Sequence, residues 1–295
     1  MSRLLSTLRV LVSCLLFLTG AAVRPVVGQT PEPPLDPAAT NAATVATAQA
    51  AVDDDGALDL AEPDFTVVNI PTTLRLPLHK GNFHLTHRFN GNLRNGSFGQ
   101  QASELFGLDR GATIGFEYRY GIARHVELAA YRSSFVRTIQ LSGKYDAIHQ
   151  SAANPISVSG LVSVEGPNNF QERFGPALGA VVSRTIQQRV ALYAAPIWVH
   201  NSAASLGVDR DTFQVGVGGR ARLGASTYVV AEVTPRVAGY APGQVEYGFG
   251  IEKRYGGHVF QLTFANAQGT TFGQLARGGS PETLYLGFNL SRKFF

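Results

Sequence analysis

Residues 112–120 read Ala112-Thr-Ile-Gly-Phe-Glu-Tyr-Arg-Tyr120, and the alternation in this stretch decides the fold. Every second residue is apolar or aromatic, and the residues between them are Thr, Gly, Glu and Arg. Successive side chains of a β-strand point to opposite faces, so this spacing predicts a strand with one apolar and one hydrophilic face.

The same pattern recurs along the chain about twelve times. It predicts strands near residues 82–90, 110–120, 124–133, 136–146, 156–165, 174–185, 189–200, 211–223, 226–237, 243–254, 257–265 and 283–295. Most of these runs are close to the roughly 9 to 11 residues with which a tilted strand crosses a membrane. The sequence therefore predicts an all-β, closed, antiparallel up-and-down barrel of about 12 strands.

Connection lengths give a second indication of a membrane barrel. The first and last connections, 91–109 and 266–282, are long, whereas corners such as 122–123 and 224–225 are tight. Outer-membrane barrels combine long extracellular loops with short periplasmic turns, so long and short connections should alternate. The third and fourth connections depart from this order, because a short corner at 134–135 precedes a longer stretch at 149–155.

A soluble β-sandwich also alternates, with its apolar face inward. Here the hydrophilic face is rich in Gly, Ser, Thr, Gln and paired charges, which suits a polar lumen, and aromatic residues recur near the ends of the apolar faces. A spanning sheet must also close, because lipid offers no partner to free backbone groups. We therefore favour the membrane barrel and keep a soluble periplasmic binding protein as an alternative.

The N-terminus predicts export. Residues 1–28 combine Arg3 and Arg9, a short apolar run and a small-residue cleavage site, as a signal peptide does. Cys14 interrupts that apolar run instead of ending it, which argues against lipidation, and it is the only cysteine of the chain. Cleavage would remove it, and with it thiolate chemistry.

Composition separates two further parts. Residues 29–66, rich in Ala, Pro, Thr and Asp, are predicted to be a flexible acidic linker in the periplasm, and residues 67–295 the barrel. From Phe65 onward the chain has 22 Lys and Arg against 13 Asp and Glu, a net charge of about +9. Pro71 and Pro77 make the stretch 72–78 a lead-in to the barrel and not one of its central strands.

The C-terminal strand ends in aromatic residues. Outer-membrane barrels commonly end with an aromatic-terminated strand that the barrel-assembly machinery reads, and residues 284–295 fit this description. Phe294 and Phe295 are the predicted assembly signal. The expected partners are this machinery and outer-membrane lipid, with no nucleic acid, no cofactor and no other identifiable protein.

The stretch 72–145 resembles a known family. Residues 72–89 (TTLRLPLHKGNFHLTHRF) and 108–135 (LDRGATIGFEYRYGIARHVELAAYRSSF) are similar to an uncharacterised family of bacterial outer-membrane proteins with a membrane-bound β-barrel domain. The similarity continues through 228–235 to the terminus. The resemblance implies location and architecture, and it carries over no activity.

Charged residues on the hydrophilic faces are the main candidates for function. We expect Glu117, Arg119, Arg132, Arg220, Arg222, Glu246 and Glu252 to line the lumen. A surplus of cations in a pore favours anions, which predicts a narrow, anion-leaning channel. The equal alternative is that acidic residues, Glu127 and Glu232 among them, pair with these cations and close the lumen, leaving a non-conducting structural barrel.

Other motifs have weaker functional interpretations. His149-x-Ser151 and His200-x-Ser202 place imidazole and hydroxyl on one strand face, as in a barrel-embedded lipid hydrolase, but no orienting acid is identifiable. His84 and His87 lie on opposite faces and cannot chelate one metal ion. The glycines of 216–219 and 248–250 precede no helix, so they indicate curvature or close packing and not a phosphate loop. We therefore predict a protein that is not an enzyme.

Overall fold

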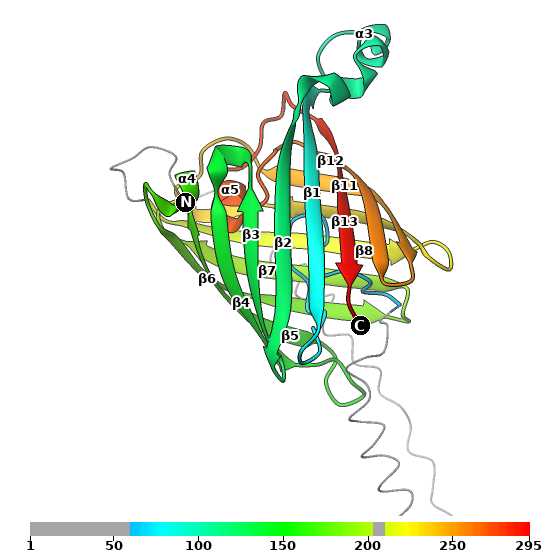
Figure 1. Cartoon of the computed structure of the whole chain (residues 1–295). Coiled ribbons are helices and arrows are strands. Elements are labelled where there is room, and N and C mark those ends of the chain that lie inside the picture. Colours follow the sequence, from blue (N-terminus) through cyan, green and yellow to red (C-terminus); the bar gives the residue numbers. More distant parts are fainter. Residues whose placement is uncertain (1–59, 203–209) are drawn as a thin grey trace, which may run out of the picture. The chain divides into compact units, whose positions relative to one another are not determined.

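The computed structural model describes residues 60–202 and 210–295, in which antiparallel strands form one closed barrel (Figure 1). Its wall consists of β1 (Gly81–Asn92), β2 (Ala112–Ala123), β3 (Val126–Ser133), β4 (Ile139–Ile148), β5 (Ser157–Gly166), β6 (Gly175–Ile186), β7 (Val190–Val199), β8 (Thr212–Arg222), β9 (Thr227–Thr234), β11 (Glu246–Tyr255), β12 (His258–Ala265) and β13 (Tyr285–Lys293). The short β10 (Arg236–Gly239) follows β9 after Pro235 and pairs with β8. The predicted closed barrel of twelve strands is confirmed.

Closure comes from the pairing of the first and last strands. β1 pairs with β2 on one side and with β13 on the other, and Thr86 lies opposite both Gly115 and Asn289. Figure 1 shows β1 (cyan) beside β13 (red). Closure leaves the wall without a free edge, as a sheet in hydrocarbon requires. No helix of the described residues is long and apolar enough to cross a membrane.

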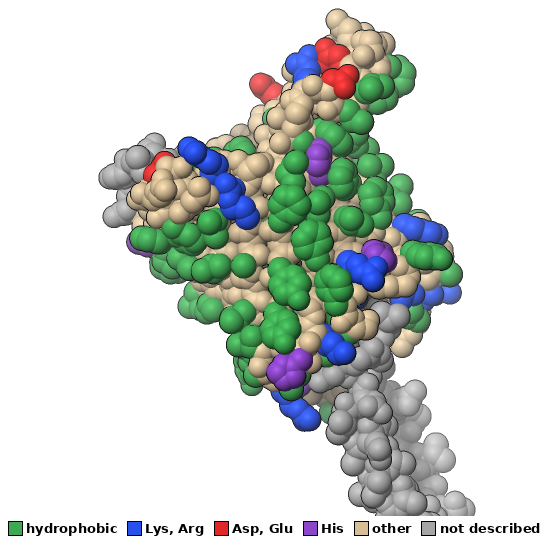
Figure 2. Space-filling view, in the orientation of Figure 1, with side chains coloured by type: hydrophobic (Ala, Val, Ile, Leu, Met, Phe, Trp, Pro, Cys, Tyr) green, Lys and Arg blue, Asp and Glu red, His purple; other side chains and the backbone are tan. Residues whose placement is uncertain are grey.

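The outer face carries the large apolar side chains. In β2, Phe116 and Tyr118 are each 49% exposed, whereas Arg119 between Tyr118 and Tyr120 is 8% exposed. Figure 2 shows the hydrophobic side chains spread over the visible outer surface of the strands. A soluble sandwich would bury these aromatics between its sheets, so their exposure supports a surface that faces lipid.

The two ends of the barrel differ. One end, the short-turn end, carries the tight connections β2–β3, β6–β7, β8–β9 and β11–β12 together with the C-terminus. The other, the long-loop end, carries α3 (Phe98–Ser103), η2 (Leu105–Arg110), η3 (Phe135–Arg137), α4 (Pro167–Phe170) and α5 (Phe272–Ala276). The third connection is longer than expected because η3 occupies it, and its neighbours keep the expected strands. Phe294 and Phe295 follow β13 and are exposed.

Residues 60–78 form a hairpin inside the barrel, which we call the lumen hairpin. Thr66 bridges Pro71, and the Val67 nitrogen donates to the Ile70 oxygen over 2.9 Å. Leu60 and residue 79 both contact the short-turn end of the wall, through Tyr228 and Gly121. The hairpin therefore enters and leaves at that end.

The described part of the predicted linker, residues 60–66, belongs to this hairpin. Phe65 is 2% exposed, and Glu62 and Asp64 are buried. These carboxylates accept from backbone nitrogens of the hairpin itself, Glu62 from Thr73 at 3.0 Å and Asp64 from Phe65 at 2.9 Å. From the sequence, these acidic residues were expected to be exposed to solvent. They are buried because local hydrogen bonds satisfy their carboxylates. Residues 29–59 lie outside the described residues, as do the predicted signal peptide and Cys14.

Candidate functional site

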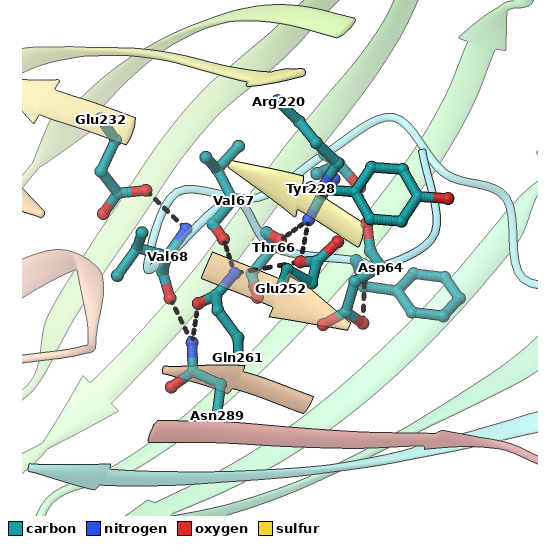
Figure 3. Close-up of polar contacts among 12 residues, drawn as sticks. Asp64, Thr66, Val67, Val68, Arg220, Tyr228, Glu232, Glu252, Gln261 and Asn289 are labelled. Atoms are coloured by element: carbon teal, nitrogen blue, oxygen red, sulfur yellow. Dashed lines mark hydrogen bonds and ion pairs between the residues drawn. The ribbon is translucent and has the colours of Figure 1, made fainter. Parts of the chain in front are cut away.

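The tip of the lumen hairpin is bound by a carboxylate of the wall. Glu232 of β9 accepts hydrogen bonds from the backbone nitrogens of Val68, Asn69 and Ile70, at 2.9, 2.9 and 3.1 Å. Figure 3 shows the bond to Val68. The turn directs three successive N–H groups to one side, where an anion satisfies them together. Glu232 thus fixes the hairpin at its far end.

Carbonyl oxygens of the hairpin are bound by donors from other strands. Arg220 of β8 donates to the Thr66 oxygen at 2.8 Å. Gln261 of β12 donates to the Val67 oxygen at 2.6 Å, and Asn289 of β13 to the Val68 oxygen at 2.9 Å. Figure 3 shows these side chains converging on the hairpin from separate strands. The polar wall is therefore matched to the hairpin main chain.

Two ionic networks lie in the wall around the hairpin. Arg220 pairs with Glu252 at 2.9 Å, and both side chains are fully buried. The second network joins Arg119 to Glu117 and Glu127, and Lys144 to Glu127 and Asp146. Buried charges need partners of opposite sign, and these pairs supply them. Seven described lumen charges are thus joined in ion pairs.

Phe65 lies against the cations of the second network. Its ring centroid is 5.6 Å from both the Arg119 guanidinium and the Lys144 ammonium, and 5.8 Å from the Lys293 ammonium. Cations within about 6 Å of an aromatic face are attracted by its quadrupole. The ring therefore fills this part of the lumen and attracts the cations around it near the short-turn end.

Glycines of the wall make room for the hairpin. A Cβ atom on Gly216 or Gly218 of β8 would lie 2.6 or 2.8 Å from side-chain atoms of Ile70. On Gly248 of β11 it would lie 3.1 Å from Val68. The glycine runs that indicated close packing are thus places where the hairpin approaches the wall.

The long-loop end is filled by the connection from β12 to β13. Gly273 of α5 donates its backbone N–H to Glu165 of β5 at 3.0 Å, and Thr270 contacts the Tyr131 hydroxyl at 2.5 Å. Leu275 and Ala276 are buried. Between this loop and the hairpin lies a cavity of only about 30 Å³. The described lumen is therefore filled from both ends.

Most of the predicted lumen charges lie on the inner face. Glu117, Arg119, Arg220, Glu246 and Glu252 line the lumen around the hairpin. Arg222 lies on the same face at the short-turn rim, where it donates to the Gly224 and Ala225 oxygens.

Arg132 is a correction, because it lies on the outer face of β3. Its strand neighbour Tyr131 is buried and points inward, with its hydroxyl hydrogen-bonded to Thr86 and Thr270. Arg132 therefore shares the outward face with Leu128 and lies opposite Phe116 of β2. The prediction for Arg132 was therefore wrong, whereas Glu127 of the same strand, expected as a partner for lumen cations, does point inward.

Several residues that bind the hairpin were not singled out from the sequence as binding groups. They are Arg88, Lys144, Gln261 and Asn289, and Glu232 was named only as a partner for cations. Each lies on the hydrophilic face of its strand, which is a visible signal. Their common partner was not visible, because the hairpin shows no strand alternation.

The serines of the two His-x-Ser pairs are hydrogen-bonded to groups other than histidine in the described residues. The His200 Nδ1 atom lies 2.7 Å from Asp211, an acidic partner that the sequence did not reveal, and the His200 ring stacks on Trp198 on the side of the strand away from the buried Ser202. Ser202 is buried and bonds to the Thr212 hydroxyl at 2.7 Å. Ser151 accepts backbone N–H groups of its own turn. The described residues also contain no group of three or more His, Cys, Asp or Glu arranged for a metal ion.

The match to a family model covers nearly all of the described chain. Residues 64–294 match the family described as Membrane bound beta barrel domain (DUF5777). The chain belongs to this family. The predicted resemblance is therefore confirmed, and a barrel of the outer-membrane type agrees with the apolar outer face. No curated protein sequence matches the chain.

Solved structures with a similar fold are porins and channels of low sequence identity. The NanC porin has a TM-score of 0.48 at 5% identity, over 72% of this chain and 100% of its own. The KdgM porin, in complex with disordered oligogalacturonate, has 0.48 at 6%, over 74% and 100%. An outer membrane channel from Pseudomonas putida F1 has 0.46 at 11%, over 75% and 97%.

Proposed function

We propose that this protein is an outer-membrane channel that its own lumen hairpin holds closed. The observation that carries the proposal is the set of hydrogen bonds from Glu232, Arg220, Gln261 and Asn289 to the hairpin backbone. The hairpin enters at the short-turn end, which faces the periplasm in barrels of this type. A segment that enters and leaves at one end can withdraw without threading through the wall.

The preference of the open channel for anions stays a prediction. The charges of the buried residues of the wall give it no further support. The buried charged residues of the strands are Arg88, Arg119, Lys144, Arg220 and Lys293 against Glu127, Asp146, Glu165, Glu232, Glu246 and Glu252. The two signs nearly balance. Exposed cations such as Lys80, Arg124 and Arg189 lie instead near the short-turn rim, where they would act on solutes at the periplasmic entrance.

A disulfide that can be formed and reduced tests directly whether the hairpin closes the channel. The Thr73 and Ser183 hydroxyl oxygens are 2.5 Å apart and join the hairpin to β6. The double variant T73C/S183C should form a disulfide that fixes the hairpin in the lumen. Cys14 lies within the predicted signal peptide, so the mature variant carries only the two new thiols.

Planar-bilayer recording gives the readout. The oxidised variant should show no conductance steps at any voltage, whereas the reduced variant should show rare openings that become frequent in moderate urea. The T73S/S183A variant, which cannot form a disulfide, is the control and should be indifferent to reductant. Steady conductance of the oxidised form would refute the gate. Silence of both forms under all conditions would favour the non-conducting structural barrel.

A further inference from the structure

The wall binds the lumen hairpin mainly through groups that every polypeptide has. Eight main-chain groups of the hairpin accept from or donate to wall side chains. They are the oxygens of Leu60, Thr66, Val67, Val68 and Leu74 and the nitrogens of Val68, Asn69 and Ile70. Main-chain hydrogen bonds supply affinity without reading sequence, as they do when a strand is added to a sheet.

The donors and acceptors come from separate strands of the wall. The side chains involved are Lys144 of β4, Arg220 of β8, Tyr228 and Glu232 of β9, Gln261 of β12 and Asn289 of β13. The barrel thus surrounds the peptide backbone instead of pairing with it along one edge. Such a site holds a peptide at fixed depth and direction.

A second part of the wall is apolar and packs against side chains of the hairpin. Val67, Val68 and Ile70 pack in one cluster with inner-face residues of β5, β6, β7 and β9. Those residues are Leu161, Ala177, Val181, Ala191, Tyr193, Ala195, Ile197, Val199 and Val230. Packing of this kind depends on the volume and shape of the apolar side chains. Apolar residues of similar volume in the peptide can therefore replace those of the hairpin. The lumen therefore combines a hydrogen-bonding side with an apolar side.

We propose that the lumen is a polypeptide-binding site of which the hairpin is the resident occupant. When the hairpin is displaced, the site accepts a peptide of unrelated sequence that forms the same turn and carries apolar residues at the spacing of Phe65, Val67, Val68 and Ile70. This inference rests on the proposed function, because it requires a hairpin that can leave. The ligands that the open barrel binds are therefore peptides.

The experiment uses the full folded chain with a cut connection. A protease recognition sequence is inserted between His79 and Lys80, which are exposed between the hairpin and β1. After folding in detergent micelles and cleavage, the hairpin is held without a covalent link to the barrel. Fluorescence anisotropy then follows the binding of a labelled peptide of residues 60–78.

Two competitor peptides separate main-chain from sequence recognition. The first keeps apolar residues at the four positions named above and changes every other side chain. The second has the native sequence with N-methyl groups on the amides of positions 68, 69 and 70, which removes the donors to Glu232. We expect the first to compete within about threefold of the native peptide and the second to be at least about tenfold weaker.

The outcomes are decisive in both directions. Saturable binding after cleavage, with the stated order of competitors, supports the site. Failure of the altered-sequence peptide, no effect of N-methylation, or no exchange of the native peptide each overturns it. The uncut protein is the control and should bind at least about tenfold less labelled peptide, because its tethered hairpin competes at high effective concentration. Failure of the gate itself is seen separately, as conductance of the oxidised T73C/S183C variant.

Discussion

The Glu232 carboxylate lies 2.9 Å from the backbone nitrogen of Val68, 164 positions away in the sequence. The contact joins the first described segment of the chain to a strand late in the barrel. The position of the hairpin therefore depends on the folded wall, and the stability of the hairpin reports on the strands around it.

Replacing Glu232 should loosen the hairpin tip. The E232A variant leaves three buried N–H groups without their acceptor, and an unpaired buried donor costs about 1 to 3 kcal/mol. We expect the amides of residues 68–70 to exchange with deuterium at least about 30-fold faster, which corresponds to about 2 kcal/mol. Hydrogen exchange with mass spectrometry measures this.

The matched controls for this change are E232Q and E104A. The glutamine keeps one acceptor oxygen and should give an intermediate rate, while Glu104 lies in the exposed loop beyond β1 and should leave the hairpin unchanged. Equal protection of residues 68–70 in E232A and in the unaltered protein would show that Glu232 does not hold the tip.

The buried pair Arg220 and Glu252 should show strong coupling. Its atoms are 2.9 Å apart with both side chains fully buried. Removing one charge of such a pair costs about 3 to 5 kcal/mol, since the other is left uncompensated. We expect R220M to lower the free energy of unfolding by this amount in urea titrations in micelles. The double variant R220M/E252L should lose less than R220M alone, and a double loss equal to the sum of the single losses would contradict the coupling.

The wall was predictable because its alternation is local. In β2 the pattern of Gly115, Glu117 and Arg119 gave the inner face correctly, and the strand bounds followed from turns rich in Gly and polar residues. In β3 the rule failed at Arg132, although Glu127 of that strand was expected in the lumen and lies there. Tyr131 is inward because its hydroxyl has lumen partners, and only the folded barrel supplies those partners.

The hairpin lay beyond sequence reasoning for a related reason. Pro71 and Pro77 interrupt any strand alternation, and the acidic residues before Phe65 indicated solvent. What places the hairpin in the lumen are Glu232, Arg220 and other side chains more than 150 positions away. The lumen charges could thus be proposed from the sequence, whereas the segment they bind could not.

The lipid-facing surface makes a prediction about charge. Ala130 of β3 points outward, further from the strand end than Arg132. An arginine on the lipid face costs about 2 to 4 kcal/mol near the bilayer midplane and little near the interfaces. A130R should therefore lower the folded fraction in lipid vesicles, measured by the heat-dependent shift on gels, and R132L should not. Tolerance of A130R with loss in R132L would place Arg132 in the lumen after all.

The long loop after β1 should respond to acid. Glu104 and Arg110 lie beside a polar cavity of about 170 Å³, and the hydrogen bond from Arg110 lowers the pKa of Glu104. A lowered carboxyl pKa means that the contact stabilises the loop at neutral pH and is lost as the pH falls through that pKa. NMR titration of Glu104 should show the low value, and R110Q should return it toward the ordinary one. An unshifted Glu104 would indicate that the two side chains do not stay together in solution.

Phe65 should stabilise the folded protein more through the volume it fills than through the attraction of its aromatic ring for cations. It is 2% exposed, and Arg119, Lys144 and Lys293 surround its face. Truncation to alanine leaves a cavity, which costs about 3 to 5 kcal/mol for a buried phenylalanine. Leucine restores most of the volume and removes only the cation–π attraction, worth about 0.5 to 2 kcal/mol. Urea unfolding should therefore rank F65L close to the unaltered protein and F65A far below it. If F65L is as damaging as F65A, the attraction between the ring and the three cations stabilises the protein more than the volume of the side chain does.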